Sequence, residues 1–234
     1  RTDMNAREMF ISELYGYVTT AIQLLKADKT NPCAFKVNED LTNQQIGIIM
    51  MRIYCIVKLS YIESSDYTKD DNAELAVYID DPFDTAYGLY TTSTGYIKSL
   101  IQSYHRGLKD KDIDDIIAWL KNNVMTVQRT ISNDLVAVNN GIFDYKNKIL
   151  LPFTPSMVFI NKIPVNFNPK MSRPPIYTDH GENWDIESWF HSLSDDPAVI
   201  NTLWQYIGAT IRPNVAWGKA LFLLNPGGNN GKGS

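Results

Sequence analysis

The chain has 234 residues, of which 44% are hydrophobic and 12% aromatic, and its formal net charge is −4. This composition excludes a disordered chain, and the weak negative charge argues against a protein that simply coats nucleic acid. Because no apolar run reaches membrane-spanning length and no signal peptide opens the sequence, we expect no membrane partner and a cytoplasmic location.

The first part of the chain has the pattern of helices. Apolar residues recur at helical spacing over residues 4–27, which predicts a long helix with one apolar face that ends at Thr30-Asn31-Pro32. A second helix is predicted from Thr42, because Thr42 and Gln45 have the spacing of a capping box. Residues 53–61 are rich in β-branched and aromatic side chains and could form a strand instead.

An acidic segment follows. Residues 66–84 contain seven acids and one base. Residues 75–79 and 87–90 predict two short strands with an Asp-rich turn between them. Asp80 and Asp81 could be metal ligands of a primase site, but adjacent strand residues point to opposite faces, so an ordinary turn is favoured. A helix is then predicted over residues 94–105, with Thr94 as the cap. Asp110 or Asp112 begins the next helix, and with the strands the two helices could form a winged-helix-like unit. The predicted buried side of the second helix is Ile113, Ile116, Ile117 and Leu120.

The two cysteines, Cys33 and Cys55, are too few for a disulfide framework or a zinc site. Both lie among apolar neighbours, so the sequence predicts buried, reduced thiols. The three histidines are far apart and have no carboxylate or cysteine at ligand spacing, so no catalytic or metal-binding residue is assigned.

From residue 135 short strands replace helices. Strands are predicted at residues 135–138, 142–145, 149–153, 158–160 and 165–167, and the prolines between them favour a small, irregular antiparallel sheet. A helical pair follows. Asp185 caps residues 186–193, and Asp196 caps a helix that Pro197 begins and Arg212-Pro213 ends. The aromatic residues of this pair have helical spacing, which favours a core role over a base-stacking platform.

Residues 139–175 form the basic part of the chain. They contain five bases and one acid, and also aromatic residues, which together are the ingredients of a single-stranded DNA groove. The alternative is a β-rich scaffold whose lysines are only solvated, and the sequence favours it slightly. The candidate DNA-binding residues are Lys146, Lys148, Lys162, Lys170 and Arg173, and the candidate stacking residues are Tyr145, Phe153, Phe159 and Phe167.

The last fourteen residues have the layout of a nucleotide phosphate loop. A short apolar run at 221–224 predicts a buried strand, and a glycine-rich turn and Lys232 follow it. Backbone N–H groups of such a turn converge on phosphate oxygens, and the lysine adds a positive charge. The motif is imperfect, because Pro226 stands at the first glycine position and Gly233 follows the lysine. A flexible terminus is the alternative interpretation, and we expect both a phosphate-loop motif and a frayed end.

Several segments occur in an order that resembles phage and plasmid primase–helicases, relatives of the poxvirus primase–helicase. They are residues 135–145, 151–155 and 184–193, the following tryptophan-bearing helix, and the ending Asn229-Asn230-Gly231-Lys232-Gly233-Ser234. The resemblance extends over about residues 130–234 and is thinner before that. In this family such a region precedes a superfamily 3 helicase motor, which resembles other hexameric rings that move on single-stranded DNA using ATP.

The resemblance implies ATP and magnesium in the full-length parent, and none in this chain alone. By position, the nucleotide-binding residues are Gly228, Asn230, Gly231, Lys232 and Ser234, and the magnesium-binding acids lie beyond Ser234. It also implies single-stranded or forked DNA as a partner, a hexameric homo-oligomer, and a bacterial cell or phage-infected host. The chain is therefore expected to be cut from a longer protein and inactive alone.

The predicted fold class is α+β. The sequence predicts a mostly helical subdomain with a small hairpin over residues 1–130, a β-rich part with a helical pair over residues 131–218, and the truncated start of a phosphate-loop domain over residues 219–234. The predicted function is a collar or linker domain of a primase–helicase in DNA replication. The alternatives are a single-stranded DNA-binding module and, less favoured, a primase catalytic domain.

Overall fold

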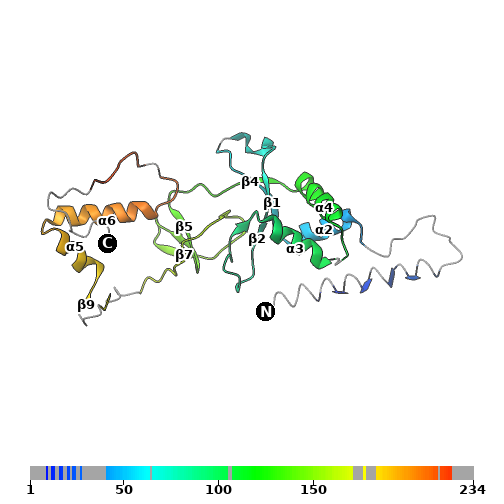
Figure 1. Ribbon diagram of the computed structural model, residues 1–234, viewed down its shortest axis with the longest axis horizontal. Coiled ribbons are helices and arrows are strands. Elements are labelled where there is room, and N and C mark those ends of the chain that lie inside the picture. The colour runs from blue at the N-terminus through cyan, green and yellow to red at the C-terminus, as the bar shows by residue number, and fades with distance from the viewer. Residues whose placement is uncertain are drawn as a thin grey trace. The chain divides into compact units, whose positions relative to one another are not determined.

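The computed structural model describes residues 41–222, except residues 64, 105–106, 171–175, 178–182 and 216, together with single residues between 9 and 27 (Figure 1). Those single residues are helical, as the sequence predicts, and Met9, Tyr17 and Leu24 among them are exposed. The fold is α+β, which confirms the predicted class. The chain divides into two compact units. Unit 1 comprises residues 1–130 and 153–161, and unit 2 comprises residues 131–152 and 162–234.

Unit 1 contains a four-stranded sheet in the order β3-β2-β1-β4. Its strands are β1 (Ile56–Ser60), β2 (Glu74–Tyr78), β3 (Tyr90–Thr91) and β4 (Thr126–Gln128). Strand β1 is antiparallel to β2 and parallel to β4. The strand alternative for residues 53–61 is thus confirmed, whereas β4 was missed, because three residues are too few to show a period of two. Between β1 and β2 lies a short 3₁₀ helix, η1 (Ser65–Lys69).

Three helices cover one face of this sheet: α2 (Asn43–Ile53), α3 (Thr94–Tyr104) and α4 (Asp110–Asn123). Thr42 and Gln45 form the predicted capping box of α2, with both reciprocal hydrogen bonds present. The cap of α3 is Ser93 and not Thr94, since the Tyr96 N–H donates to Ser93 Oγ at 3.3 Å. The buried core between helices and sheet comprises Ile46, Met50, Ile56, Leu75, Val77, Ile97, Ile101, Tyr104, Ile113, Ile116, Leu120 and Val124.

The predicted winged-helix-like unit is wrong, because α3 and α4 pack with α2 on a four-stranded sheet and not beside an isolated hairpin. The predicted burial of Cys55 is also wrong. Its side chain is exposed at the point where the chain leaves α2 and enters β1. An apolar neighbourhood in sequence does not bury a residue that lies between two elements. Cys33 lies outside the described residues.

The opposite face of the sheet is covered by residues 153–161, which form a strap that returns to unit 1 from the β-rich part of the sequence. The Tyr90 N–H donates to the Phe159 carbonyl at 2.8 Å, and the Tyr90 hydroxyl donates to the Pro155 carbonyl at 2.8 Å. Under the strap Tyr90 packs on Tyr78, with ring centroids 5.3 Å apart. Burial raises the pKa of both tyrosines to about 12.

Unit 2 contains a three-stranded antiparallel sheet, β5 (Leu135–Val138), β6 (Gly141–Asp144) and β7 (Ile149–Leu151), in that order. These strands confirm the predictions at residues 135–138 and 142–145, with β7 ending two residues early. The strands predicted at 158–160 and 165–167 are not present. Residues 158–160 belong to the strap. Near residue 165 the chain forms no strand, but Ile163 makes an isolated parallel bridge to Val138, and the Asn139 N–H donates to the Val165 carbonyl at 2.9 Å.

Unit 2 also contains the predicted helical pair, α5 (Ile186–Leu193) and α6 (Pro197–Ile211), which follows a small two-stranded sheet of β8 (Ile176–Tyr177) and β9 (Asn183–Trp184). Asp185 and Asp196 cap the two helices as predicted. Phe190 is buried and meets the Trp204 ring edge to face at 4.9 Å. The core role predicted for the helix stripe is only partly correct, because only Ile200 of α6 is buried, whereas Val199, Trp204 and Ile211 are exposed.

Leu221 and Phe222, the described part of the predicted strand at 221–224, have no regular secondary structure. Residues 223–234, which contain the whole candidate phosphate loop, lie outside the described residues. Within the described part of the chain, no helix is both long and apolar enough to cross a membrane.

Candidate nucleic-acid interface

Three aromatic rings form a cluster on one face of the sheet of unit 2. Phe143 in β6 and Tyr145 just after it point to the same face, because side chains alternate along an extended strand. Their rings meet edge to face with centroids 5.1 Å apart. The Phe167 ring stacks on Phe143 at 4.3 Å, with 28° between the ring planes. All three side chains are half-buried, so the cluster retains accessible aromatic surface.

Asn140 fixes the position of Phe167. Its side-chain amide donates to the Phe167 carbonyl at 2.9 Å, and its side-chain oxygen accepts from the Phe167 N–H at 2.9 Å. A carboxamide thus satisfies both backbone groups of one residue, as a neighbouring strand would. The Phe167 ring is therefore held against the sheet by a side chain of the β5–β6 turn.

Two cations lie over the Tyr145 ring. Lys148 Nζ is 4.4 Å from the ring centroid, and the Arg212 guanidinium carbon is 5.6 Å from it. Both separations are within the range of cation–π attraction. Lys148 has a positive φ of 58°, which turns the chain back into β7. Arg212 donates to Asp134 Oδ1 at 2.5 Å and to the Asn133 carbonyl at 3.2 Å, so its guanidinium is fixed whereas Lys148 is exposed and can move.

Asp144 shapes the β6–β7 turn that carries the lysines. Its carboxylate accepts from the backbone N–H of Asn147 at 3.0 Å, from the Asn147 side chain at 2.7 Å, and from the backbone N–H of Lys146 at 2.9 Å. These bonds, led by the Asn147 backbone N–H, lower the pKa of Asp144. Asp144, the one acid among residues 139–175, therefore stabilises the turn. Lys146 and Lys148 remain at the surface beside Tyr145.

The structure divides the predicted DNA-binding set. Lys146 and Lys148 lie on the turn next to the aromatic cluster, and Lys162 and Lys170 lie in the segment that leads to and follows Phe167. Arg173 lies outside the described residues. Phe153 and Phe159 do not join the cluster, because they belong to the strap of unit 1, where the Phe153 ring meets Tyr87 edge to face at 5.4 Å.

Asp80 and Asp81 lie in the connection between β2 and β3. Asp81 Oδ1 accepts from the Phe83 N–H at 3.0 Å, which is the bonding of an Asp-rich turn. Among the described residues, no three His, Cys, Asp or Glu side chains gather as a metal site would require. The nucleotide-binding candidates Gly228, Asn230, Gly231, Lys232 and Ser234 lie outside the described part.

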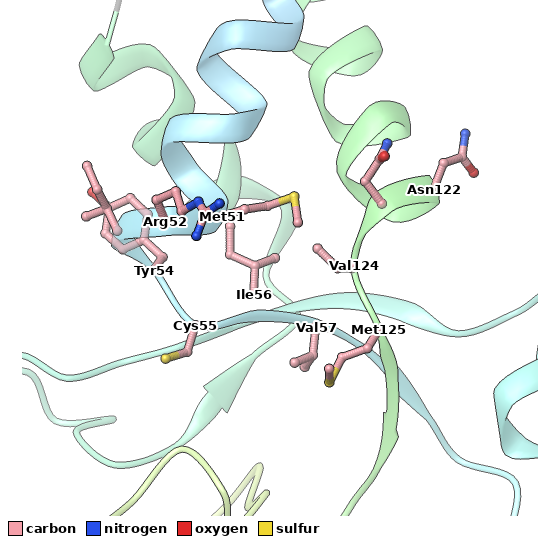
Figure 2. A pocket seen from close by; sticks show the side chains of 11 residues that line it. Met51, Arg52, Tyr54, Cys55, Ile56, Val57, Asn122, Val124 and Met125 are labelled. Carbon is pink, nitrogen blue, oxygen red and sulfur yellow. The ribbon is translucent and has the colours of Figure 1, made fainter.

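Unit 1 has a pocket of about 620 Å³ between the C-terminal ends of α2 and α4. Figure 2 shows Met51, Ile56 and Val124 around the space between the two helix ends, above the start of β1. The lining is mainly apolar, with Arg52 at the edge. The residues that line it are Met51, Arg52, Ile53, Tyr54, Cys55, Ile56, Val57, Asn122, Asn123, Val124 and Met125.

A family model described as "D5 N terminal like" matches residues 68–191, which is more than half of the chain. The chain belongs to this D5 N-terminal-like family. The family is the N-terminal region of D5-like primase–helicase proteins, so the chain is of a kind that takes part in DNA replication. A comparison with curated proteins gave no match.

The D5 N-terminal-like segment contains the aromatic cluster, Lys146, Lys148, Lys162 and Lys170. It extends further towards the N-terminus than the resemblance noted from the sequence, which was thinner before residue 130. It includes only one side of the unit 1 pocket, since residues 51–57 precede it. Arg212 and the candidate phosphate-loop residues follow it.

Three residues of the candidate interface were missed from the sequence. Phe143 could have been found, because it alternates with Tyr145 in a predicted strand. Asn140 and Arg212 had been given other roles, as a turn residue and a helix-ending residue. Their contacts with Phe167 and Tyr145 join residues 27 and 67 positions apart in the sequence, and no local pattern indicates them.

Proposed function

We propose that this chain is the region that precedes an ATP-driven superfamily 3 helicase motor in a primase–helicase of a phage or mobile element. There it acts as a collar that arranges the subunits of a ring and passes DNA to the motor. The family match over residues 68–191 carries this proposal. The strand-loop-lysine pattern of residues 221–234 supports it from the sequence.

The test is ATP hydrolysis by the complete protein, with and without single-stranded DNA. Lys232→Ala is expected to lower the DNA-stimulated rate by about 100-fold or more, because it removes a charge that stabilises the transferring phosphate. Lys219→Ala is the matched control, since it removes an exposed lysine thirteen residues earlier and should leave turnover unchanged. Full activity of Lys232→Ala would remove the nucleotide-binding role of the loop.

A second function is favoured by the aromatic cluster. We propose that unit 2 itself contacts single-stranded DNA, with Tyr145 and Phe167 against bases and Lys146, Lys148 and Lys162 on phosphates. Aromatic faces accept any base, and neutralised phosphates release counterions. The exposed Lys148 supports the proposal, because its ammonium group can move from the Tyr145 ring to a phosphate and open the ring face to a base.

Binding of the 234-residue chain to an oligothymidine at several salt concentrations tests this second function. Changing Lys146, Lys148 and Lys162 to Gln is expected to weaken binding and to reduce the salt slope by about 2. The matched control changes three exposed lysines of unit 1, Lys69, Lys111 and Lys121, to Gln. Equal losses from the two triple variants would mean that net charge, and not this face, attracts DNA.

A further inference from the structure

An exposed phenylalanine is held at the tip of the loop between β2 and β3. Phe83 is 77% exposed. The loop around it is fixed by hydrogen bonds: the Asp84 N–H donates to the Asp81 carbonyl at 3.0 Å, and the Ala86 N–H donates to Asp84 Oδ1 at 2.8 Å. A large apolar side chain on an ordered loop loses little conformational freedom on binding, which is the property of an interface anchor.

The pocket between α2 and α4 has the size and lining that such an anchor needs. Its volume of about 620 Å³ lies within the range of pockets that bind small apolar groups. Met51 and Met125 flank it, and Met125 is 72% exposed. Methionine side chains adapt their shape to an inserted ring and make favourable sulfur–aromatic contacts.

The charges of the loop and the pocket are complementary. Asp80, Asp81 and Asp84 surround Phe83 in the sequence, whereas Arg52 lines the pocket and Lys121 lies in the last turn of α4. The two helix ends together carry about one negative charge, which these two cations exceed by about one. Among the described residues Arg52 has no ion-pair partner, so its charge is available to an acidic loop.

The loop and the pocket lie at the same end of the sheet of unit 1. Strand β2 is antiparallel to β1, and the Tyr78 N–H donates to the Cys55 carbonyl at 3.0 Å, so β2 ends where the pocket opens. Phe83 does not fill the pocket of its own copy, since it is exposed. Two copies related by a two-fold axis could each present the loop to the other's pocket, as a self-complementary interface requires.

We propose that two copies of this chain bind each other reciprocally, with Phe83 of each inserted between α2 and α4 of the other. The contact belongs to unit 1 alone and requires neither DNA nor ATP. A reciprocal contact closes at two copies, whereas the ring of the proposed collar needs a head-to-tail contact, so the two proposals require different contacts and fail separately.

Sedimentation velocity of the 234-residue chain over a concentration series measures the contact. The chain is expected to dimerise, more weakly at high salt, and Phe83→Ser should raise the dimer dissociation constant by about 30-fold or more. The matched control is Phe222→Ser, which removes an equally exposed phenylalanine of unit 2 and should leave dimerisation unchanged. A monomeric wild-type chain, or equal dimerisation of the two variants, would overturn the proposal.

Charge reversal and cross-linking locate the contact. Arg52→Glu should weaken the dimer, and Asp80→Arg in the same chain should restore it. In a Cys33→Ser background, oxidised Pro82→Cys, which places an exposed thiol next to Phe83 and keeps the ring, should form a covalent dimer through Cys55 of the other copy, because a disulfide needs Cα atoms within about 7 Å. Phe222→Cys, and Pro82→Cys with Cys55→Ser, should form no covalent dimer. A covalent dimer that persists without Cys55, or a ladder beyond the dimer, would refute the reciprocal arrangement.

Discussion

Gly88 is the position where a single methyl group should test the packing of the strap on the sheet. Its φ is +84°, and a Cβ atom built on it would lie 2.2 Å from Phe153 Cγ and 2.4 Å from Phe153 Cδ1. Both the backbone conformation and the strap therefore oppose any side chain here. Phe153 is held against Tyr87, so its ring cannot move away without losing that contact.

The cost of Gly88→Ala follows from these two effects. A non-glycine residue at positive φ costs about 1–2 kcal/mol, and forcing a methyl group into occupied space costs about 1–3 kcal/mol. Alanine also lowers the conformational entropy of the unfolded chain, which stabilises the folded state by about 0.4–1 kcal/mol and offsets part of this cost. We therefore expect Gly88→Ala to lower the free energy of unfolding of unit 1 by about 3 kcal/mol. In a Phe153→Ala background the clash is absent, and the same change should cost only about 1 kcal/mol.

Equilibrium urea unfolding, followed by hydrogen exchange of peptides from β2 and α4, measures unit 1 separately from unit 2. Gly95→Ala is the control in the same unit, because only Ser93 Oγ lies within 4 Å of its added Cβ atom, at 3.9 Å. That change should stabilise α3 by up to about 1 kcal/mol. The reasoning fails if Gly88→Ala costs the same with and without Phe153.

Three further predictions concern single contacts. Asn140→Ala removes both hydrogen bonds to Phe167 and should destabilise unit 2 by about 1–3 kcal/mol in urea unfolding, whereas Asn201→Ala on the exposed face of α6 should not. The Asp144 carboxyl should titrate by NMR below its ordinary pKa of 3.8. Because its folded pKa lies below the unfolded value, it stabilises unit 2 above that value and ceases to do so as the pH falls through the folded pKa, and Asp144→Asn should abolish this dependence. Tyr78 and Tyr90 should ionise near pH 12 in an ultraviolet titration, and since their folded pKa is raised, the stability that they give below pH 10 should be lost between about pH 10 and 12. If Asp144 titrated at its ordinary pKa, the hydrogen bonds to its carboxylate would be contradicted, and if either tyrosine did so, its burial would be contradicted.

The sequence predicts best what is determined by neighbours along the chain. The caps formed by Thr42, Asp185 and Asp196 lie where they were expected, because an N-cap bond joins residues two or three positions apart. The strands β5 and β6 were found because short apolar runs lie on either side of a turn sequence, Asn139-Asn140-Gly141. The cap of α3 was placed one residue too late, at Thr94 and not Ser93. Serine and threonine both form N-caps, so the residue types alone do not show which of two neighbours receives the hydrogen bond.

Contacts between distant segments could not be predicted in the same way. The basic and aromatic residues of 139–175 were taken as one candidate groove, but the strap carries Phe153 and Phe159 into unit 1. The strap binds there to the backbone of the edge strand β3 and packs the Phe153 ring against Gly88, and neither contact leaves a pattern in residues 153–161. The basic charge near Tyr145 was found from composition, whereas the stacking of Phe167 on Phe143 depended on tertiary pairing.

The family match and the fold have different boundaries, and the difference bears on function. The matched segment begins at residue 68, yet β1, which pairs with both β2 and β4, ends at Ser60. Without β1, strands β2 and β4 lose the strand with which both pair, and the core under the helices loses the buried side chain of Ile56. The matched segment is therefore not a folding unit by itself. A function that belongs to the family requires residues 41–60 of this chain as its structural support, even though the DNA-facing candidates all follow them.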